Sequence, residues 1–395
     1  MAIVKRRSRK YAIVYRVNGR QVWETIGPSK REAERAERER RRAADRGEWI
    51  APSRVTLEQY GREWLSLRDP GRVAANGRRR ARTRLETSTF DQYAGVLERH
   101  VFPRLGGRQL ASLRTTDVDA LIHSLEANGK SPGTVRNVIV PLRKMLADAV
   151  RQGLLIANPA SNADLPPAQD FVGQEIPSEH TEAIREALAE LARPDPLRDG
   201  EPDLLFAYLF DVALGTGLRL GELRGLRWSD VDFERTLIRV EQAYSRRTLK
   251  RPKTDAGIRS VPLFPSAEAA MRELAARAFT RGRFADDQLV FTTERGTPLD
   301  GSNFNHLVWS KALQLAGLGD WTVDGQGKRR WKNRYRFHDL RHTAVSRLVA
   351  EGADVRLVQA VAGHSKASLT LDRYTHLTDE RVREAAKRFD PARKR

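Results

Sequence analysis

Residues that suit attack on a phosphodiester gather near the C-terminal end of this sequence. His338 and Arg341 are three residues apart, a spacing that places both on one face of a helix. His364 and Tyr374 follow within a few dozen residues. A guanidinium suits two phosphate oxygens, and a phenol becomes a nucleophile when a base removes its proton. This combination of residue types predicts phosphoryl-transfer chemistry. When each residue is taken alone, packing or a place on the solvated surface is an alternative explanation.

Three further candidates lie upstream. Arg219 and Glu222 are three residues apart, so the carboxylate could orient the guanidinium. The alternative is a helical surface ion pair, which contributes little. Lys253 lies between two predicted strands, where it could protonate a leaving oxygen as a general acid; the alternative is a solvated turn lysine.

The order of these residues resembles that of the tyrosine recombinase family, the phage integrases. The stretches that carry the resemblance are 216–223 with 226–232 for a first arginine block, 337–343 for a second block, and 363–365 with 371–376 for the end. The resemblance covers roughly residues 178–380 by motif and extends more loosely over 55–165. Ala362 and the pair Lys366-Ala367 depart from the usual family residues, and neither departure touches a catalytic role.

The resemblance implies a role for each cationic position. Arg219 and Arg341 would clamp the scissile phosphate and stabilise its transition state. His338 would take the proton of the nucleophile, and His364 would hydrogen-bond the phosphate. Lys253 would protonate the departing 5′ oxygen.

The nucleophile itself would be Tyr374, which would attack phosphorus and form a 3′-phosphotyrosyl link. Glu222 and Asp339 would support the cationic residues rather than bind a ligand. Because five cationic or polarising groups would take the place of a metal, we expect no cofactor, neither Mg²⁺ nor ATP.

The charge balance favours nucleic acid as the partner. The 395 residues include 71 Lys and Arg against 51 Asp and Glu, a formal net charge of +20. A basic protein without such a partner is the alternative. The absence of cysteine excludes disulfides, thiol nucleophiles and cysteine–zinc sites. No apolar run approaches the ~20 residues of a membrane span, so we expect a cytoplasmic protein with no membrane partner.

The predicted fold class is α+β, mostly helical, in three domains. Residues 1–50 contain strands at 11–17 and 21–26 around an Asn18-Gly19 turn, then a charged helix over 30–46. They resemble the arm-site DNA-binding domain of integrases, a three-stranded sheet and a helix; a disordered basic tail is the alternative. Residues 55–165 are predicted as a helical core-binding domain, 166–177 as a linker and 178–395 as the catalytic domain.

The predicted helix N-caps are polar residues that stand just before a stretch with apolar residues at helical spacing. The predicted N-caps in 55–165 are Thr56, Thr87, Thr116 or Asp117, and Ser131. Pro141 should kink the last of these helices. The catalytic domain is predicted to contain helices at 179–191, 204–214, 220–226, 302–315, 340–351, 355–362 and 378–389, and strands at 236–244, 259–264 and 289–291.

The sequence therefore predicts an integrase that integrates or excises a phage or mobile element. Strand exchange between two duplexes needs four active sites, which implies a homotetramer on core and arm DNA sites, with an excisionase and a DNA-bending host factor as further partners. The alternatives are a dimer-resolving Xer-like recombinase, a non-cleaving DNA-binding regulator of the same fold, and a type IB topoisomerase. A basic loop at 68–84 and a hairpin at 321–331 have no assigned role beyond DNA contact or packing.

Overall fold

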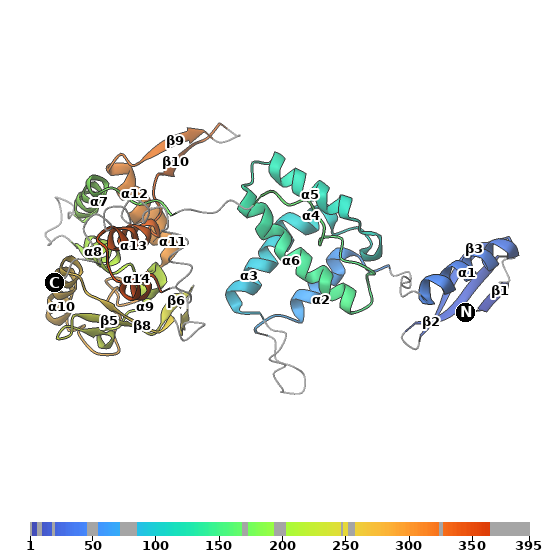
Figure 1. Cartoon of the computed structure of the whole chain (residues 1–395), viewed down its shortest axis with the longest axis horizontal. Helices are drawn as coiled ribbons and strands as arrows, with labels where there is room; N and C mark the ends of the chain where they lie inside the picture. Colours follow the sequence, from blue (N-terminus) through green and yellow to red (C-terminus); the bar gives the residue numbers. More distant parts are fainter. Residues whose placement is uncertain are drawn as a thin grey trace, which may run out of the picture. The chain divides into compact units, whose positions relative to one another are not determined.

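The computed structural model shows an α+β, mostly helical protein, as predicted (Figure 1). It describes residues 2–5, 10–17, 20–45, 54–71, 85–167, 173–192, 203–245, 248–251, 257–323 and 327–363. The chain divides into two compact units, Met1–Asp170 and Phe171–Arg395. The boundary falls inside the segment 166–177 that was predicted as a linker, and the separation of the first unit into two domains stays a prediction.

The N-terminal sheet has the three strands that the family resemblance implies. These are β1 (Ala2–Lys5), β2 (Tyr11–Val17) and β3 (Arg20–Gly27), antiparallel with β2 in the middle. Helix α1 (Lys30–Asp45) follows, and its Ala33 is buried together with Ala12, Ile13 and Val14 of the central strand. Strands 11–17 and 21–26 and the charged helix are therefore confirmed. The Asn18-Gly19 turn lies outside the described residues.

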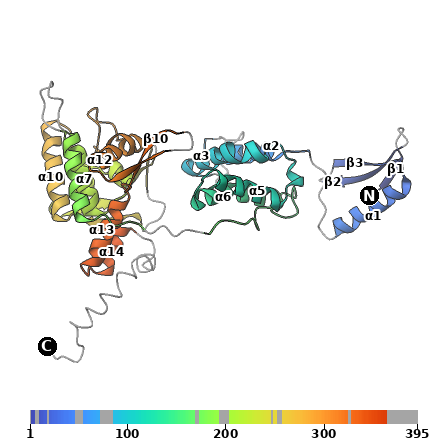
Figure 2. The same cartoon turned by 90° about the horizontal axis from the view of Figure 1, so that it is seen from above.

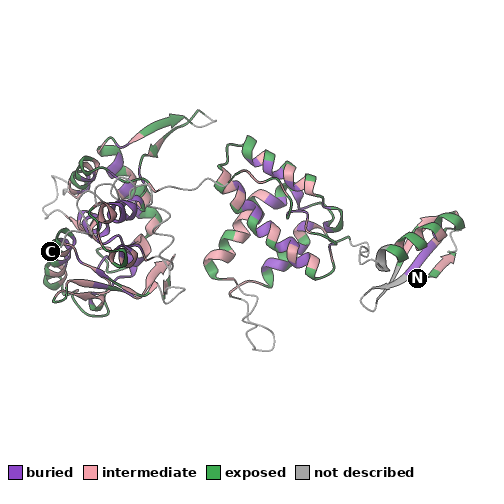
Figure 3. Ribbon diagram, viewed as in Figure 1, coloured by how far each residue is buried: buried purple, intermediate pink, exposed green. Residues whose placement is uncertain are grey.

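The helical part of the first unit packs around one apolar core (Figure 3). Its helices are α2 (Leu57–Ser66), α3 (Thr87–Val96), α4 (Phe102–Leu105), α5 (Thr115–Ala127) and α6 (Pro132–Arg151). A π turn, Leu97–Val101, joins α3 to α4. Helix α6 is helical on both sides of Pro141, so the helix is not ended there.

Two of the predicted N-caps are confirmed by their hydrogen bonds. The Thr56 hydroxyl accepts from the Gln59 amide at 3.2 Å, and the Gln59 side chain accepts from the Thr56 amide at 3.0 Å, which completes a capping box. The Ser131 hydroxyl accepts from the Thr134 amide at 3.3 Å.

The other two predicted caps are wrong. Glu86 occupies the N-cap of α3, and Thr87 is already the first helical residue. Helix α5 begins after Arg114, whose backbone amide donates to the Asp117 carboxylate at 3.0 Å. Asp117 therefore satisfies the helix start from inside its first turn, where a carboxylate also complements the helix dipole.

Gly61 permits close packing of α2 in this core. A Cβ atom at this position would lie 2.7 Å from the Phe102 ring and 3.1 Å from the Met145 sulfur. Gly61→Ala should therefore lower the free energy of unfolding by about 1–3 kcal/mol through overpacking. Hydrogen exchange of the α2 and α6 amides measures this locally. Gly107→Ala is the matched control, because a Cβ there meets nothing within 4 Å; equal protection in both variants would contradict the packing argument.

The second unit contains several helices and a small antiparallel sheet, whose strands run along the lower edge of this unit in Figure 1; Figure 2 shows the same helices from above. The helices are α7 (Ser178–Leu191), α8 (Leu205–Thr216), α9 (Leu220–Gly225), α10 (Pro265–Thr280), α11 (Gly301–Asn303), α12 (Ser310–Leu315), α13 (Asp339–Ala350) and α14 (Val355–Ala362). Apolar α8 packs against α7, α10 and α13, which makes it central to this core. The sheet order is β4 (Val231–Asp232), β5 (Leu237–Val240), β8 (Arg259–Pro262).

Two predicted strands of this unit need correction. The stretch 236–244 is not one strand: Thr236 has φ of +51°, and the chain forms β5 and then β6 (Ala243–Ser245), which pairs with β7 (Thr248–Lys250). The stretch 289–291 is not a strand, since Leu289 makes a single isolated bridge to Arg227. Val290 and Phe291 are buried in the core without joining a sheet, and the periodicity of the sequence cannot distinguish such a segment from a buried strand.

The hairpin predicted at 321–331 is confirmed as β9 (Gly319–Val323) and β10 (Arg329–Asn333), which project from the body of the second unit (Figure 1). Trp321 and Trp331 oppose each other with ring centroids 5.7 Å apart, and the Arg329 guanidinium lies 5.1 Å from the Trp321 ring centroid. This cross-strand aromatic pair stabilises the ribbon.

Other predicted segments fall partly or wholly outside the described residues. The helix at 378–389 and most of the loop at 68–84 belong to this group. No helix in the described parts of the chain has the length and apolar character needed to cross a membrane.

Candidate active site

The turn between α8 and α9 positions the first arginine of the candidate site. Gly217 ends α8 with φ of +63°, a left-handed conformation that favours glycine. A Cβ there would also lie 2.8 Å from Cγ1 of Val361 in α14. Arg219 follows at the N-cap of α9. The turn that carries Arg219 is therefore packed directly against α14.

Arg341 connects the second arginine block to this turn. It lies in the first turn of α13, its side chain is buried, and its Nη1 donates to the Gly217 carbonyl at 2.7 Å. Leu340 and Val345 face the core on the same helix, as predicted. The bond to Gly217 brings together two arginine blocks that are far apart in the sequence.

Glu222 holds the Arg219 guanidinium in place. Its carboxylate accepts from the Arg219 amide and from Arg219 Nη1, both at 2.8 Å. Its two oxygens also accept from Nη1 and Nη2 of Arg259, each at 3.0 Å. Burial alone would raise the pKa of Glu222, but the hydrogen bonds and charges of Arg259, with the charge of Arg219, lower it to about 2. Glu222 is buried, so the surface-pair alternative is wrong.

His338 occupies the N-cap of α13 beside the two arginines. Its ring meets that of His342 edge to face, with centroids 5.2 Å apart. Partial burial lowers the pKa of His338, and cationic or protonatable neighbours lower it further, to about 4. These neighbours are His342, Arg341, Arg219 and Arg336. The imidazole is therefore neutral near pH 7 and can accept a proton.

The depressed pKa of His338 is directly measurable. Its ring should titrate near pH 4, well below the usual ~6.5 of a histidine, because protonation adds a charge beside existing cations. NMR of labelled imidazoles at increasing acidity would follow it, with His338→Gln identifying the signal. His342→Gln removes one of the lowering neighbours, so it should raise the pKa of His338. A His338 signal that titrates near pH 6.5 would contradict this arrangement.

Asp339 is buried at the start of α13, where it fixes the entry into the helix. Its carboxylate accepts from the Arg336 amide at 2.7 Å and from Arg336 Nη2 at 3.0 Å. The carboxylate therefore anchors the residue three positions earlier and orients the turn that carries His338. This contact is consistent with the supporting role that the sequence predicted.

The structure thus brings together Arg219, Glu222, His338 and Arg341. Lys253, His364 and Tyr374 lie outside the described residues. Sequence reasoning did not single out Arg259, which begins β8 and pairs with Glu222, nor His342. The only hint of Arg259 in the sequence was that a charged residue begins an otherwise alternating strand. An exposed strand end has the same pattern, so the sequence does not distinguish the two.

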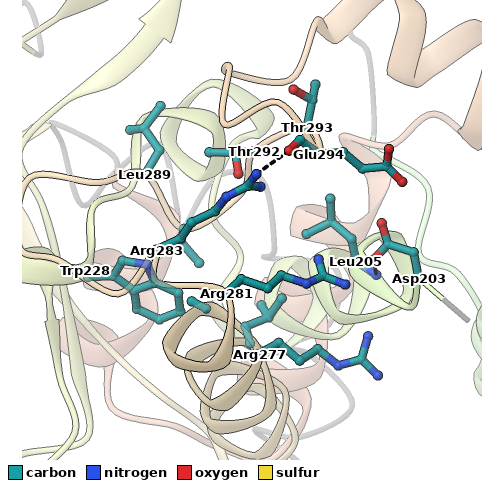
Figure 4. A pocket seen from close by; sticks show the side chains of 13 residues that line it. Asp203, Leu205, Trp228, Arg277, Arg281, Arg283, Leu289, Thr292, Thr293 and Glu294 are labelled. Atoms are coloured by element: carbon teal, nitrogen blue, oxygen red, sulfur yellow. Dashed lines mark hydrogen bonds between the residues drawn. The ribbon is translucent and has the colours of Figure 1, made fainter. Parts of the chain in front are cut away.

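No cluster of three or more potential metal ligands of the His, Cys, Asp or Glu type occurs among the described residues. A cavity of about 60 Å³ lies elsewhere in the second unit, at the end of α10 (Figure 4). Arg277, Arg281 and Arg283 line it, and Arg283 donates to the Glu294 carbonyl. Cations at the C-terminal end of a helix complement its dipole, so this group of arginines has a structural explanation.

The candidate site is instead the cluster of two guanidinium groups and a neutral imidazole described above. Such a cluster is suited to binding an anion and removing a proton.

Comparisons with known proteins identify the family to which this chain belongs. A profile of the phage integrase family matches residues 179–381. The chain is 27% identical over 383 residues to a tyrosine recombinase XerC-like protein of Caldanaerobacter subterraneus subsp. tengcongensis, covering 90% of this chain and 88% of that protein. It is 23% identical over 329 residues to the transposase of transposon Tn916 from Enterococcus faecalis, covering 80% of this chain and 76% of the transposase.

Solved structures share the fold at low sequence identity. The Tn1549 transposon integrase in complex with a circular intermediate DNA superposes with a TM-score of 0.61 at 21% identity, covering 85% of this chain and 99% of that one. A lambda integrase dimer bound to a COC′ core site gives a TM-score of 0.58 at 15% identity, covering 100% of this chain and 97% of that one. The family profile spans 203 of the 395 residues, counted from 179 to 381. This chain belongs to the phage integrase family of tyrosine recombinases.

Proposed function

We propose that this protein is a site-specific DNA recombinase of the integrase type, which cleaves and rejoins DNA through a 3′-phosphotyrosyl intermediate. The observation that carries the proposal is the buried hydrogen bond from Arg341 to the Gly217 carbonyl at 2.7 Å. In this bond the guanidinium of the second block contacts the turn that presents Arg219, and the charges of both arginines lower the pKa of His338. A phosphodiester is the substrate class that two guanidinium groups and a neutral base fit.

In this proposal each residue acts at one atom of the reacting phosphodiester. Arg219 and Arg341 neutralise the non-bridging oxygens as negative charge builds in the transition state. His338, neutral near pH 7, takes the phenolic proton of Tyr374 as the phenol oxygen attacks phosphorus. The bond from phosphorus to the 5′ oxygen breaks, and Lys253 protonates that oxygen.

The remaining residues support this chemistry. His364 donates a hydrogen bond to a phosphate oxygen, while Glu222 and Asp339 hold the arginines and the start of α13. The phosphotyrosyl ester conserves the energy of the broken bond. Attack by a 5′ hydroxyl reverses the steps and rejoins the strand without ATP or a metal ion.

The N-terminal sheet and helix favour an integrase acting on a phage or mobile element. The sheet and helix of residues 2–45 resemble an arm-site binding domain. Two of the similar proteins are a transposon transposase and a transposon integrase. The partners would then be double-stranded DNA at core and arm sites, a homotetramer, an excisionase and a DNA-bending host factor. A lambda integrase tetramer bound to a Holliday junction is among the structures with this fold.

A dimer-resolving Xer-like role is the second candidate, because several similar proteins are tyrosine recombinases named XerC. The two roles differ in their substrates. An integrase joins two unlike attachment sites, whereas a resolving enzyme recombines two copies of the same site. Recombination assays with each substrate pair therefore separate them.

The cleavage proposal is tested with a suicide duplex that carries the attachment site from the junction of the element. A nick just downstream of the scissile phosphate lets the short fragment that carries the new 5′ hydroxyl diffuse away, which traps the covalent 3′-phosphotyrosyl intermediate. We expect a protein–DNA adduct on a denaturing gel, in the presence of EDTA, whose linked peptide contains Tyr374. Specific binding to the same duplex without any adduct would support the non-cleaving regulator instead.

A further inference from the structure

Arg259 has three described hydrogen bonds that join separate parts of the second unit. Its side chain is only 7% exposed. Nη1 and Nη2 donate to the two oxygens of Glu222, each at 3.0 Å, and Nε donates to the Ala360 carbonyl at 2.8 Å. The guanidinium thus connects β8 at once to α9 and to the last turn of α14.

The end of α14 is shaped to admit this guanidinium. Gly363 caps α14 with φ of +50°, and a Cβ atom there would lie 2.8 Å from Cζ of Arg259. Any side chain at this position would displace the Arg259 head group. The next residue in the sequence is His364, so Arg259 contacts the helix end immediately before a candidate site residue.

The Arg219 guanidinium depends on this link for its orientation. Its side chain is 43% exposed, and the described contact that holds it is the bond from Nη1 to Glu222 at 2.8 Å. Glu222 in turn is held by Arg259 through both of its oxygens. An exposed arginine held by one bond would sample several rotamers if its carboxylate partner could turn.

We propose that Arg259 is a positioning residue that fixes Arg219, through Glu222, and the end of α14 in one geometry. This inference rests on the proposed recombinase function and goes beyond it by assigning a role to a residue that does not touch the DNA phosphate. A buried ion pair contributes little net stability, since desolvation offsets its attraction. The role that we assign to this ion pair is therefore the geometry that it imposes on the residues around it, and not a gain in stability.

The first test separates DNA binding from cleavage in the full-length protein. Arg259→Met keeps an unbranched apolar stem but removes all three donors, and Arg259→Lys keeps the charge but not the planar fork. We expect adduct formation on the suicide duplex to slow by about 30- to 100-fold in Arg259→Met and by less in Arg259→Lys, with affinity for the duplex changed by less than about threefold.

Arg185→Met is the matched control. Arg185 also donates to both oxygens of a carboxylate, that of Asp211, at 2.9 and 3.0 Å, but its side chain is 60% exposed. Its loss should leave the cleavage rate within about twofold, since the pair joins α7 to α8 and makes no hydrogen bond to Arg219, Glu222, His338 or Arg341 among the described residues. Circular dichroism verifies that all variants are folded.

The pH dependence of the cleavage rate distinguishes a positioning role of Arg259 from a simple loss of folding stability. The charged groups facing Glu222 are Arg219 on α9 and Arg259 on β8. With Arg259 removed, the pKa of Glu222 rises, so Arg259→Met should lose activity toward pH 5, where the unchanged protein does not. Adding Glu222→Gln should abolish that pH dependence and hold the rate, at pH 5 and at pH 7 alike, near the level that Arg259→Met reaches at pH 5, because glutamine mimics the protonated carboxyl. Protonation of His338 near pH 4 is common to all variants.

The outcomes distinguish this inference from the function on which it rests. If the unchanged protein forms no adduct, the proposed function itself fails. If it does and Arg259→Met cleaves at a similar rate, only the role of Arg259 is refuted. A slower Arg259→Met with an unaltered pH profile and additive effects of Glu222→Gln would also overturn the proposal, because Arg259 would then not act through Glu222.

Discussion

Tyr374→Phe should form no covalent adduct with a suicide duplex while it binds that duplex as tightly as the unchanged protein. The substitution removes a single oxygen, which is the atom proposed to attack phosphorus. Without a nucleophile, the arginines can still bind the phosphate but no phosphotyrosyl ester forms. Loss of a nucleophile in other enzymes lowers the rate by at least about 10⁴-fold. Denaturing gels measure the adduct, and gel shifts under native conditions measure binding.

Tyr208→Phe is the control for this prediction. Tyr208 lies in α8, with the Arg277 guanidinium of α10 5.2 Å from its ring centroid. Loss of its hydroxyl should leave adduct formation within about twofold. Adduct formation by Tyr374→Phe at the normal rate would show that another residue is the nucleophile.

Arg341→Lys should slow cleavage by about 10²- to 10³-fold, equivalent to about 3–4 kcal/mol of transition-state stabilisation. The side chain is buried and reaches the Gly217 carbonyl through one arm of its fork. A lysine keeps the charge but cannot bond this carbonyl and a phosphate oxygen with one planar group. Adduct formation under single-turnover conditions, with saturating protein, isolates the chemical step from binding.

Arg347→Lys is the matched control on the same helix. Arg347 lies further along α13 and donates from Nη2 to the Ile176 carbonyl at 3.1 Å and to the Ser178 hydroxyl at 3.3 Å. Its replacement should cost some stability but leave single-turnover cleavage within about threefold. Equal effects of the two substitutions would mean that Arg341 acts through the stability of α13 rather than on the phosphate.

Local patterns predicted those elements whose signals are local. The alternation of 11–17 and the 321–331 hairpin are confirmed because cross-strand pairing joins residues that are near in sequence. The Thr56 capping box is confirmed for the same reason. The prediction of a strand at 289–291 was wrong, because three consecutive apolar residues have the same sequence pattern in a strand and in an irregular core segment. Only the tertiary packing distinguishes the two.

Three features can be read from the sequence alone: the order of the arginines, histidines and tyrosine, the basic surplus that favours a polyanion, and the resemblance to the phage integrases. Together they predict phosphoryl-transfer chemistry on DNA. The tertiary structure decided which of these groups meet. Arg341 reaches the Gly217 carbonyl, and Arg259 links Glu222 to the Ala360 carbonyl, across long separations in the chain. Such contacts follow from the requirement that buried guanidinium groups find acceptors, which packing supplies and no sequence spacing encodes. The pair of His338 and Arg341 near the C-terminus is therefore one part of a candidate site, which contacts from α8, α9 and β8 connect to residues far away in the sequence.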